Sequence, residues 1–292
     1  MEIRYIERET GEIRTETPPA ESLLRFLYDN PCGKTTILPI VKRKFISEIY
    51  GRRMNTPASA KKISAFVNEM GIDMSESEKE IAEFCSFNDF FVRKLKPEAR
   101  QIQKGFVSPG DGRLIAFDRL CDLQSFFVKG QEFTLAAFLK NRTLAEKYSN
   151  SSLFILRLAP NDYHRFHFPY AGVPSPAKKI KGFYCSVSPY AIAENFAKVF
   201  CENKREYTIL DTKDKGEVLI APIGATMVGS IVETYQANLA VKKGTEMGYF
   251  AFGGSTILML VKQQNIKIDE DILQNTKNRM ETFVKMGEKI AR

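Results

Sequence analysis

Short apolar segments separated by turn residues occupy the chain from Phe106 onward, and this pattern most restricts what the chain can fold into. The segments are rich in β-branched and aromatic residues, as is typical of strands. Predicted strands lie at residues 106–107, 113–117, 153–158, 207–210, 217–221, 226–232 and 256–261. The sequence therefore predicts an α+β fold in which residues 86–292 form a β-rich domain of mostly antiparallel sheet.

The first part of the chain has a different pattern. An extended or hairpin start is expected over residues 1 to about 20, and apolar residues then recur at helical spacing from Glu21 to Met70, with lysines and arginines on the other side. We expect residues 1–85 to form an N-terminal region with amphipathic helices. Further helices are predicted at residues 77–84, at residues 188–200 and from about Asp271 to the end of the chain.

Positive charge is concentrated in this N-terminal region. The chain has 43 basic and 35 acidic residues, a net charge of +8, and residues 41–62 contain seven basic residues and one acidic residue. Such a segment suits an anionic partner, either nucleic acid or an anionic lipid surface, although a solvated basic face is equally consistent with it. Because no nucleic-acid-binding signature is present, we do not expect nucleic acid as a partner.

Several classes of protein are disfavoured by what the sequence lacks. Its longest uncharged runs, residues 218–232 and 247–261, have 15 residues each, fewer than the roughly 20 that a spanning helix needs. The N-terminus has no secretion-signal pattern, which places the protein in the cytoplasm or on a surface that faces it. Five cysteines without a CxxC pair and two histidines predict neither a disulfide framework nor a metal site.

A Gly-Gly-Ser-Thr turn joins two apolar runs near the end of the chain. Gly253 and Gly254 allow close backbone approaches, and Ser255 then enters the predicted strand 256–261. This local pattern has two readings: a bulge or hairpin corner in a core strand, or a serine held in position for chemistry.

Two other segments contain residues suited to proton transfer. Both histidines, His164 and His167, lie within four residues of each other, and Asp111 occupies the glycine-flanked turn Ser108-Pro109-Gly110-Asp111-Gly112. Histidine moves protons near neutral pH, and a carboxylate can orient an imidazole. Together with Ser255 these residues offer an Asp, His and Ser set, although each motif taken alone is also consistent with an ordinary turn.

Five segments in the same order resemble phosphatidylserine decarboxylase proenzymes. The resemblance spans residues 86–256, and residues 284–288 also resemble the end of the family's chains. Some members have Leu-Gly-Ser-Thr where this chain has Gly-Gly-Ser-Thr, but the Gly254-Ser255 junction is intact. The segments are residues 86–95, 108–112, 163–167, 223–231 and 253–256.

The resemblance implies that the protein cleaves itself before Ser255. Ser255 Oγ, deprotonated by His167 with Asp111 orienting the ring, would attack the carbonyl of Gly254 and form an ester. Elimination and hydrolysis would then leave residues 1–254 as the large chain and 255–292 as the small chain. Ser255 would become a covalent pyruvoyl group, which is the expected cofactor. Asp162 is the alternative orienting residue.

The implied activity is that of a carboxy-lyase. The pyruvoyl group would form a Schiff base with phosphatidylserine, release CO2 and yield phosphatidylethanolamine, with His164 as the proton donor. The expected partners are phosphatidylserine and an anionic membrane surface, and the two chains would stay associated, with a homodimer left open. The protein is expected as a peripheral protein on the cytoplasmic side of the cell membrane, bound through the basic amphipathic helices.

Two alternatives remain at the sequence level. One is a conventional serine hydrolase that uses Asp111, His167 and Ser255 without cleavage, although the chain lacks a G-x-S-x-G nucleophile elbow. The other is a non-catalytic membrane-binding or nucleic-acid-binding protein whose basic helices carry the function. Cleavage of the chain at residue 254 separates the decarboxylase from both.

Overall fold

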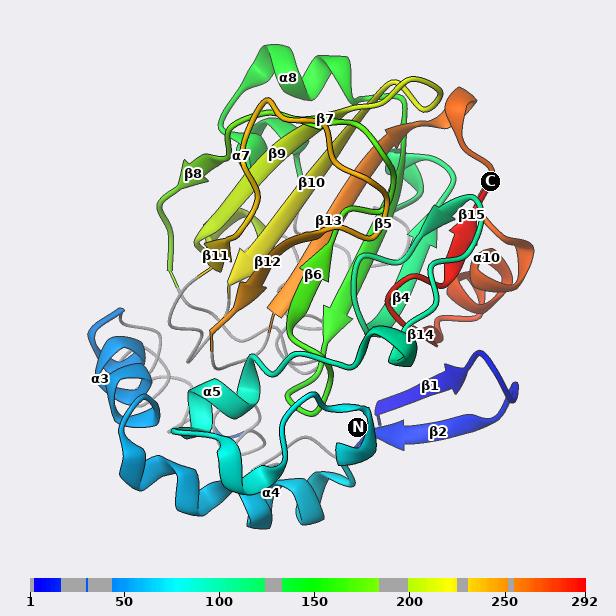
Figure 1. The fold of residues 1–292 in the computed structure, drawn as a ribbon. Helices are drawn as coiled ribbons and strands as arrows, with labels where there is room; N and C mark the ends of the chain where they lie inside the picture. Colours follow the sequence, from blue (N-terminus) through cyan, green and yellow to red (C-terminus); the bar gives the residue numbers. More distant parts are fainter. Residues whose placement is uncertain are drawn as a thin grey trace.

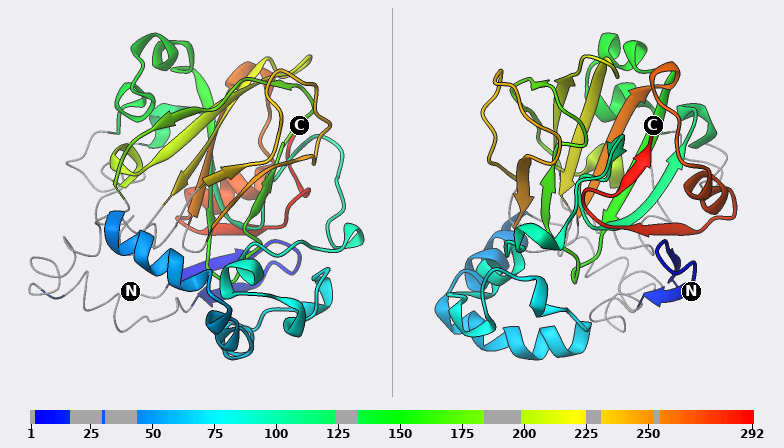
Figure 2. Two further views of the ribbon diagram at one scale, coloured as in Figure 1. Left: turned by 60° about the vertical axis from the view of Figure 1, so that its left-hand side comes forward. Right: turned by 45° about the vertical axis from the view of Figure 1, so that its right-hand side comes forward.

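The protein has three layers in a computed structural model, which describes residues 3–16, 30, 44–123, 133–183, 199–224, 231–251 and 255–292. A large sheet forms the middle layer, a smaller sheet covers one face, and helices cover the other (Figures 1 and 2). The large sheet has ten strands in the order β2-β1-β14-β4-β5-β13-β10-β9-β7, with β8 also paired to β9. Among the described pairs in this sheet only β1 and β14 are parallel, so the predicted α+β fold with a mostly antiparallel sheet is confirmed.

The large sheet has long strands at its centre and short strands at its edges. Its centre consists of β4 (Gly112–Phe117), β5 (Ser151–Leu158), β13 (Ser255–Lys262), β10 (Glu217–Gly224) and β9 (Arg205–Asp211). One edge consists of β14 (Glu281–Val284), β1 (Ile3–Glu7) and β2 (Ile13–Glu16), and the other of β7 (Val173–Pro174) and β8 (Lys178–Ile180).

The outer layers are built from shorter elements. The smaller sheet contains β11 (Ile231–Glu233), β12 (Glu246–Phe250) and β6 (Arg165–His167), and β3 (Phe106–Val107) pairs with β15 (Lys289–Ala291). The helices on the opposite face are α7 (Leu135–Leu139), α8 (Arg142–Lys147) and α10 (Glu270–Lys277).

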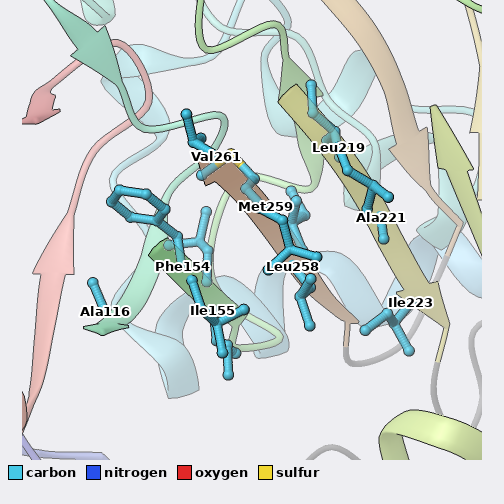
Figure 3. Packing of buried hydrophobic residues seen from close by; sticks show 14 of the residues in the cluster. Ala116, Phe154, Ile155, Leu219, Ala221, Ile223, Leu258, Met259 and Val261 are labelled. Atoms are coloured by element: carbon cyan, nitrogen blue, oxygen red, sulfur yellow. The ribbon is translucent and has the colours of Figure 1, made fainter. Parts of the chain in front are cut away.

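The central strands form the main core because both of their faces are covered. In β13 every residue from Ser255 to Val261 is buried, which explains why its sequence is a continuous apolar run and does not alternate. Figure 3 shows Ala116, Phe154 and Met259 packed across β4, β5 and β13. These three side chains lie in one row, because Ala116 is opposite Phe154 and Phe154 is opposite Met259.

A second, smaller core holds the N-terminal helices. It joins α3 (Lys44–Met54) and α4 (Ile63–Met70) to α5 (Phe87–Phe91) through seven buried side chains: Met54, Ile63, Val67, Phe84, Phe87, Phe90 and Phe91. The predicted hairpin at the start of the chain is confirmed as β1 and β2, which extend the large sheet. The division at residue 85 stays a prediction.

The predictions for the other helices had mixed outcomes. The helical pattern before Met70 is present as a 3-10 helix, Pro57–Lys62, followed by α4. The helix predicted at residues 77–84 is wrong, since only Ile81–Glu83 form a 3-10 turn. The expected helices between residues 17 and 43, apart from Asn30, and most of the helix at 188–200 lie outside the described residues.

The prediction of one helix from Asp271 to the end of the chain is wrong beyond α10. Arg279 has a left-handed φ of 58°, which ends the helix, and the following residues form β14 between β1 and β4. In β14 the side chains of Thr282 and Val284 are buried, so the apolar spacing there follows the period of a strand.

Candidate active site

Ser255 is the first residue of β13 and lies between two neighbouring strand ends. It pairs with Leu158 at the end of β5 and with Gly224 at the end of β10. Its side chain is fully buried, and its Oγ has no hydrogen-bond partner within the described part of the chain. A buried hydroxyl without a hydrogen bond lowers the stability of the fold. This supports the interpretation of Ser255 as a serine held in position for chemistry.

The histidine segment follows directly after Leu158 and forms β6. In β6 Arg165 pairs with Tyr249 of β12, and His167 pairs with Glu246. The carbonyl of His164 accepts a hydrogen bond from the Phe250 amide at 2.9 Å. The register therefore puts His164 at the end of β12 that leads to residues 252–254. His167 lies three residues further along the chain, roughly 10 Å away at about 3.3 Å per residue.

Backbone carbonyls fix the orientation of both imidazole rings. His164 Nδ1 lies 2.9 Å from the carbonyl oxygen of Asp162, and His167 Nδ1 lies 3.1 Å from that of Gly244. Because a carbonyl oxygen only accepts, each Nδ1 must carry the proton, and in the neutral ring the lone pair is on Nε2. Both histidines thus present the nitrogen that can accept a proton on the side away from the carbonyl.

His167 has a second partner in Tyr163, whose hydroxyl lies 3.2 Å from Nε2. Burial raises the pKa of Tyr163, so the hydroxyl keeps its proton and donates it to Nε2. Burial lowers the pKa of His167 below its usual 6.5, and the charges of Glu246 and Asp111 oppose this effect only in part. A neutral His167 is the form that a general base requires.

Asp111 is hydrogen-bonded to Arg100 and to the backbone of Met286, and not to His167 as expected. Its carboxylate accepts from Arg100 Nη2 at 2.6 Å and Nε at 3.0 Å, and from the Met286 amide at 2.8 Å. Among the described residues no hydrogen bond joins it to His167, whose ring is oriented by Gly244. The turn that contains Asp111 does reach His167 through the Pro109 carbonyl, which accepts from the His167 amide at 2.7 Å.

A glycine explains how this turn fits against β5. A Cβ on Gly112 would lie 2.5 Å from the carbonyl oxygen of Arg157, so only glycine allows β4 and β5 to approach so closely. The Asp111 turn is consequently fixed beside the end of the strand that leads to the histidines.

Asp162, the alternative orienting residue, contacts His164 through its backbone. Its buried carboxylate accepts from the Ala159 amide at 2.6 Å and forms an ion pair with Arg113. Burial raises the pKa of Asp162 to about 6, against the opposing effect of Arg113. Asp162 therefore shapes the loop between Leu158 and His164.

The segment at residues 86–95 supports the histidine loop. The Phe91 ring lies 4.0 Å from the His164 ring, centroid to centroid, and Arg93 Nη2 donates to the carbonyl of Asn161 at 3.2 Å. The sequence pattern indicated no role for Phe91, Arg93, Arg100 or Tyr163. The family resemblance was the only signal for Phe91 and Arg93, and the partners of Arg100 are distant in sequence.

Comparisons with known proteins give one consistent set of matches. A family model for phosphatidylserine decarboxylase matches residues 87–292. A phosphatidylserine decarboxylase proenzyme of Fusobacterium nucleatum is 52% identical over 290 residues, 98% of this chain and 96% of that protein. Proenzymes of the same name from Clostridium botulinum and Desulfitobacterium hafniense are each 43% identical, over 99% of this chain and 98% and 97% of their own lengths.

A self-processing carboxy-lyase is the class that the fold, the buried serine and these matches define, with a pyruvoyl group derived from a serine. The chain belongs to the phosphatidylserine decarboxylase family. Its substrate is phosphatidylserine, and as a proenzyme it is cleaved into two chains.

The surroundings of Ser255 fit the pyruvoyl group. Removing the serine hydroxyl breaks no hydrogen bond to a described residue, since Oγ makes none. Gly224, directly opposite Ser255 on β10, has no side chain that would fill the space beside it. Within the described ranges no helix combines the length and apolarity needed to cross a membrane.

Proposed function

We propose that this phosphatidylserine decarboxylase cleaves itself at the Gly254-Ser255 bond and that Ser255 becomes its pyruvoyl group. The observation that carries the proposal is the fully buried Ser255, whose Oγ makes no hydrogen bond to a described residue. A hydroxyl without a competing bond is ready to attack the preceding carbonyl. Gly254 has no side chain to obstruct that attack.

In the first step His167 acts as the base. Tyr163 first releases Nε2, which then takes the proton from Ser255 Oγ as the oxygen attacks the Gly254 carbonyl, and the peptide bond becomes an ester. Elimination then releases residues 1–254 with a terminal carboxylate, and hydrolysis releases ammonia from the new end of residues 255–292. The Nδ1-protonated ring and the lowered pKa of His167 support this role. Asp111 contributes by holding the turn that binds the His167 amide.

In the second reaction His164 provides the proton that replaces CO2. The pyruvoyl carbonyl supplies an electron-withdrawing group that binds the substrate amine and takes up the electron pair left by the departing CO2. His164 is fully buried, and its ring has to be protonated at Nε2 before it donates, because the neutral ring carries its one proton on Nδ1. Its Nδ1 bond to Asp162 and its contact with the Phe91 ring fix the direction of Nε2.

The two chains stay associated after cleavage. β13 of the small chain lies between β5 and β10 of the large chain, and β14 lies between β1 and β4. Backbone hydrogen bonds and buried side chains on both sides of each strand would have to be broken for the chains to separate.

The enzyme meets its substrate at an anionic membrane surface on the cytoplasmic side. The exposed Arg52 and Arg53 in the last turn of α3, beside Ile49 with 47% of its surface exposed, support contact of this helix with lipid. Arg52→Glu with Arg53→Glu should weaken binding to anionic vesicles, and unchanged binding would remove α3 from the contact.

Denaturing mass spectrometry tests the cleavage. The wild-type chain should appear as two fragments divided at Gly254-Ser255, the smaller one lacking a free amino terminus, and Ser255→Ala should remain one chain of 33.2 kDa. Conversion of phosphatidylserine to phosphatidylethanolamine should accompany cleavage and be absent in Ser255→Ala. An intact wild-type chain that is active would overturn the proposal.

A further inference from the structure

One edge of the large sheet is basic and lies outside the candidate active site. It consists of β8 and the residues that follow, and we call the side chains of Lys178, Lys179, Lys181 and Phe183 the β8 edge. All four are exposed, and Phe183 has 60% of its surface in contact with solvent. Residues 176–183 contain three lysines and no acidic residue. An exposed aromatic ring among lysines is the composition of a surface that meets lipid headgroups.

Strand pairing leaves this edge accessible. β8 pairs with β9 on one side only, and no described strand pairs with its other side. The lysines on such an edge discourage pairing with another strand, so the edge is suited to a partner that does not add a strand. Lys178 and Lys181 form no ion pair with a described residue, whereas Lys179 lies 3.9 Å from the carboxylate of buried Glu206.

The β8 edge is connected to the end of the sheet that carries Ser255. The Phe183 carbonyl accepts from the Lys204 amide at 2.9 Å, and the Lys204 carbonyl accepts from the Gly224 amide at 2.9 Å. Gly224 in turn lies opposite Ser255 on β13. Two strand spacings of about 4.8 Å separate β9 from β13, so a lipid headgroup at the β8 edge would be close to the reacting end of the sheet.

We propose that the β8 edge is a second membrane contact, in which the lysines bind anionic headgroups and the Phe183 ring inserts among them. The contact deepens the proposed function, since it holds the bilayer beside the end of the sheet where phosphatidylserine reacts. Figure 1 shows α3, the first basic contact, on the same side of the molecule as β8. One bilayer can therefore contact both α3 and the β8 edge. The β8 edge then faces the bilayer that contains the substrate, phosphatidylserine.

The test uses the full-length, self-cleaved enzyme and two variants of the edge. Lys178→Glu with Lys181→Glu reverses two charges and leaves Lys179 beside Glu206, and Phe183→Ser removes the ring. The matched control is Lys267→Glu with Lys277→Glu, which makes the same charge change at exposed positions beside α10, on the opposite side of the molecule. Cleavage of each variant at residue 254, measured by mass, serves as the check of folding.

Binding is measured by co-sedimentation with phosphatidylcholine vesicles that contain or lack phosphatidylserine, at low and high salt. We expect the double lysine variant to bind phosphatidylserine vesicles at least about tenfold more weakly at low salt, since each lysine near an anionic surface contributes about fivefold. The difference should shrink at high salt. Phe183→Ser should weaken binding at both salt concentrations. Binding equal to that of the control variant would overturn the proposal.

Activity separates this inference from the proposed function. All variants should decarboxylate short-chain phosphatidylserine, dispersed below its critical micelle concentration, at the wild-type rate, and the edge variants should be slow only on vesicles. Equal losses on dispersed and vesicular substrate would contradict a surface role. A wild-type enzyme that is inactive on both substrates would refute the proposed function, while the vesicle-binding result would still decide the role of the edge.

Discussion

The carbonyl oxygen of His164 accepts a hydrogen bond from the amide of Phe250 at 2.9 Å. This bond ties the histidine segment to the strand that leads into the Gly-Gly-Ser turn. The chemistry of the two histidines can thus be tested separately, because only His164 is fixed at that end of β12, while His167 lies opposite Glu246.

Single histidine variants should separate maturation from decarboxylation. His167→Ala is expected to remain uncleaved because it lacks the base for Ser255. His164→Ala is expected to be cleaved and to lose at least about a hundredfold in decarboxylation rate, the usual contribution of a general acid. Mass spectrometry and phosphatidylethanolamine formation measure the two steps. If His164→Ala stays uncleaved and His167→Ala is cleaved, His164 is the base for cleavage and the two roles are exchanged. The register is compatible with that outcome, because it places His164 at the end of β12 that leads to the Gly-Gly-Ser turn.

The rate of self-cleavage should respond to pH through His167. Burial lowers the pKa of this side chain below 6.5, so the neutral ring persists as the solution is acidified. We expect cleavage of chain made by cell-free translation to be constant from pH 8 down to about 6.5 and to fall only below that. A rate that already falls above pH 6.5 would argue against a buried neutral base.

Stability should fall with rising pH because of Glu206. Burial, together with the adjacent Glu233 carboxyl, raises the pKa of Glu206 from 4.5 to about 7. The folded state therefore binds a proton that the unfolded state loses between these values, and stability decreases as pH rises through this window. Glu206→Gln should raise the melting temperature relative to wild type more at pH 8 than at pH 5. The exposed Glu98→Gln should show no such difference.

The buried pair of Arg100 and Asp111 should be costly to break. Their side chains are 8% and 5% exposed and lie 2.6 Å apart, so Arg100→Met leaves a buried charge without its main partner. We expect a loss of about 3–5 kcal/mol in the free energy of unfolding. Adding Asp111→Asn should recover part of it. Urea unfolding of the single and double variants measures the coupling, and additive effects would show that the pair is unimportant.

The sequence alone predicted the parts of the fold that depend on local pattern. The apolar runs at 153–158 and 256–261 predicted β5 and β13 because buried central strands need apolar residues on both faces. The C-terminal helix was predicted too long because Phe283 and Val284 also match a helical spacing. Their pairing with β4 and β1 depends on residues far away in the chain.

The residues proposed for the site could be singled out from the sequence, but their contacts could not. Asp111, the two histidines and Ser255 stand out by residue type and family resemblance. The predicted contact of Asp111 with His167 differs from the structure because Arg100, eleven residues before it, takes the carboxylate. The orientation of each imidazole by a backbone carbonyl leaves no trace in the side-chain sequence, since every residue has such a carbonyl.

β13 is the central strand of the large sheet and also the first segment after the proposed break. The chain must consequently fold completely before it is cut, since the strand has its place only between β5 and β10. Cleavage then makes refolding slower, because two separated pieces must find each other again and refolding changes from a unimolecular to a bimolecular process. The lifetime of the mature molecule therefore depends mainly on its unfolding rate.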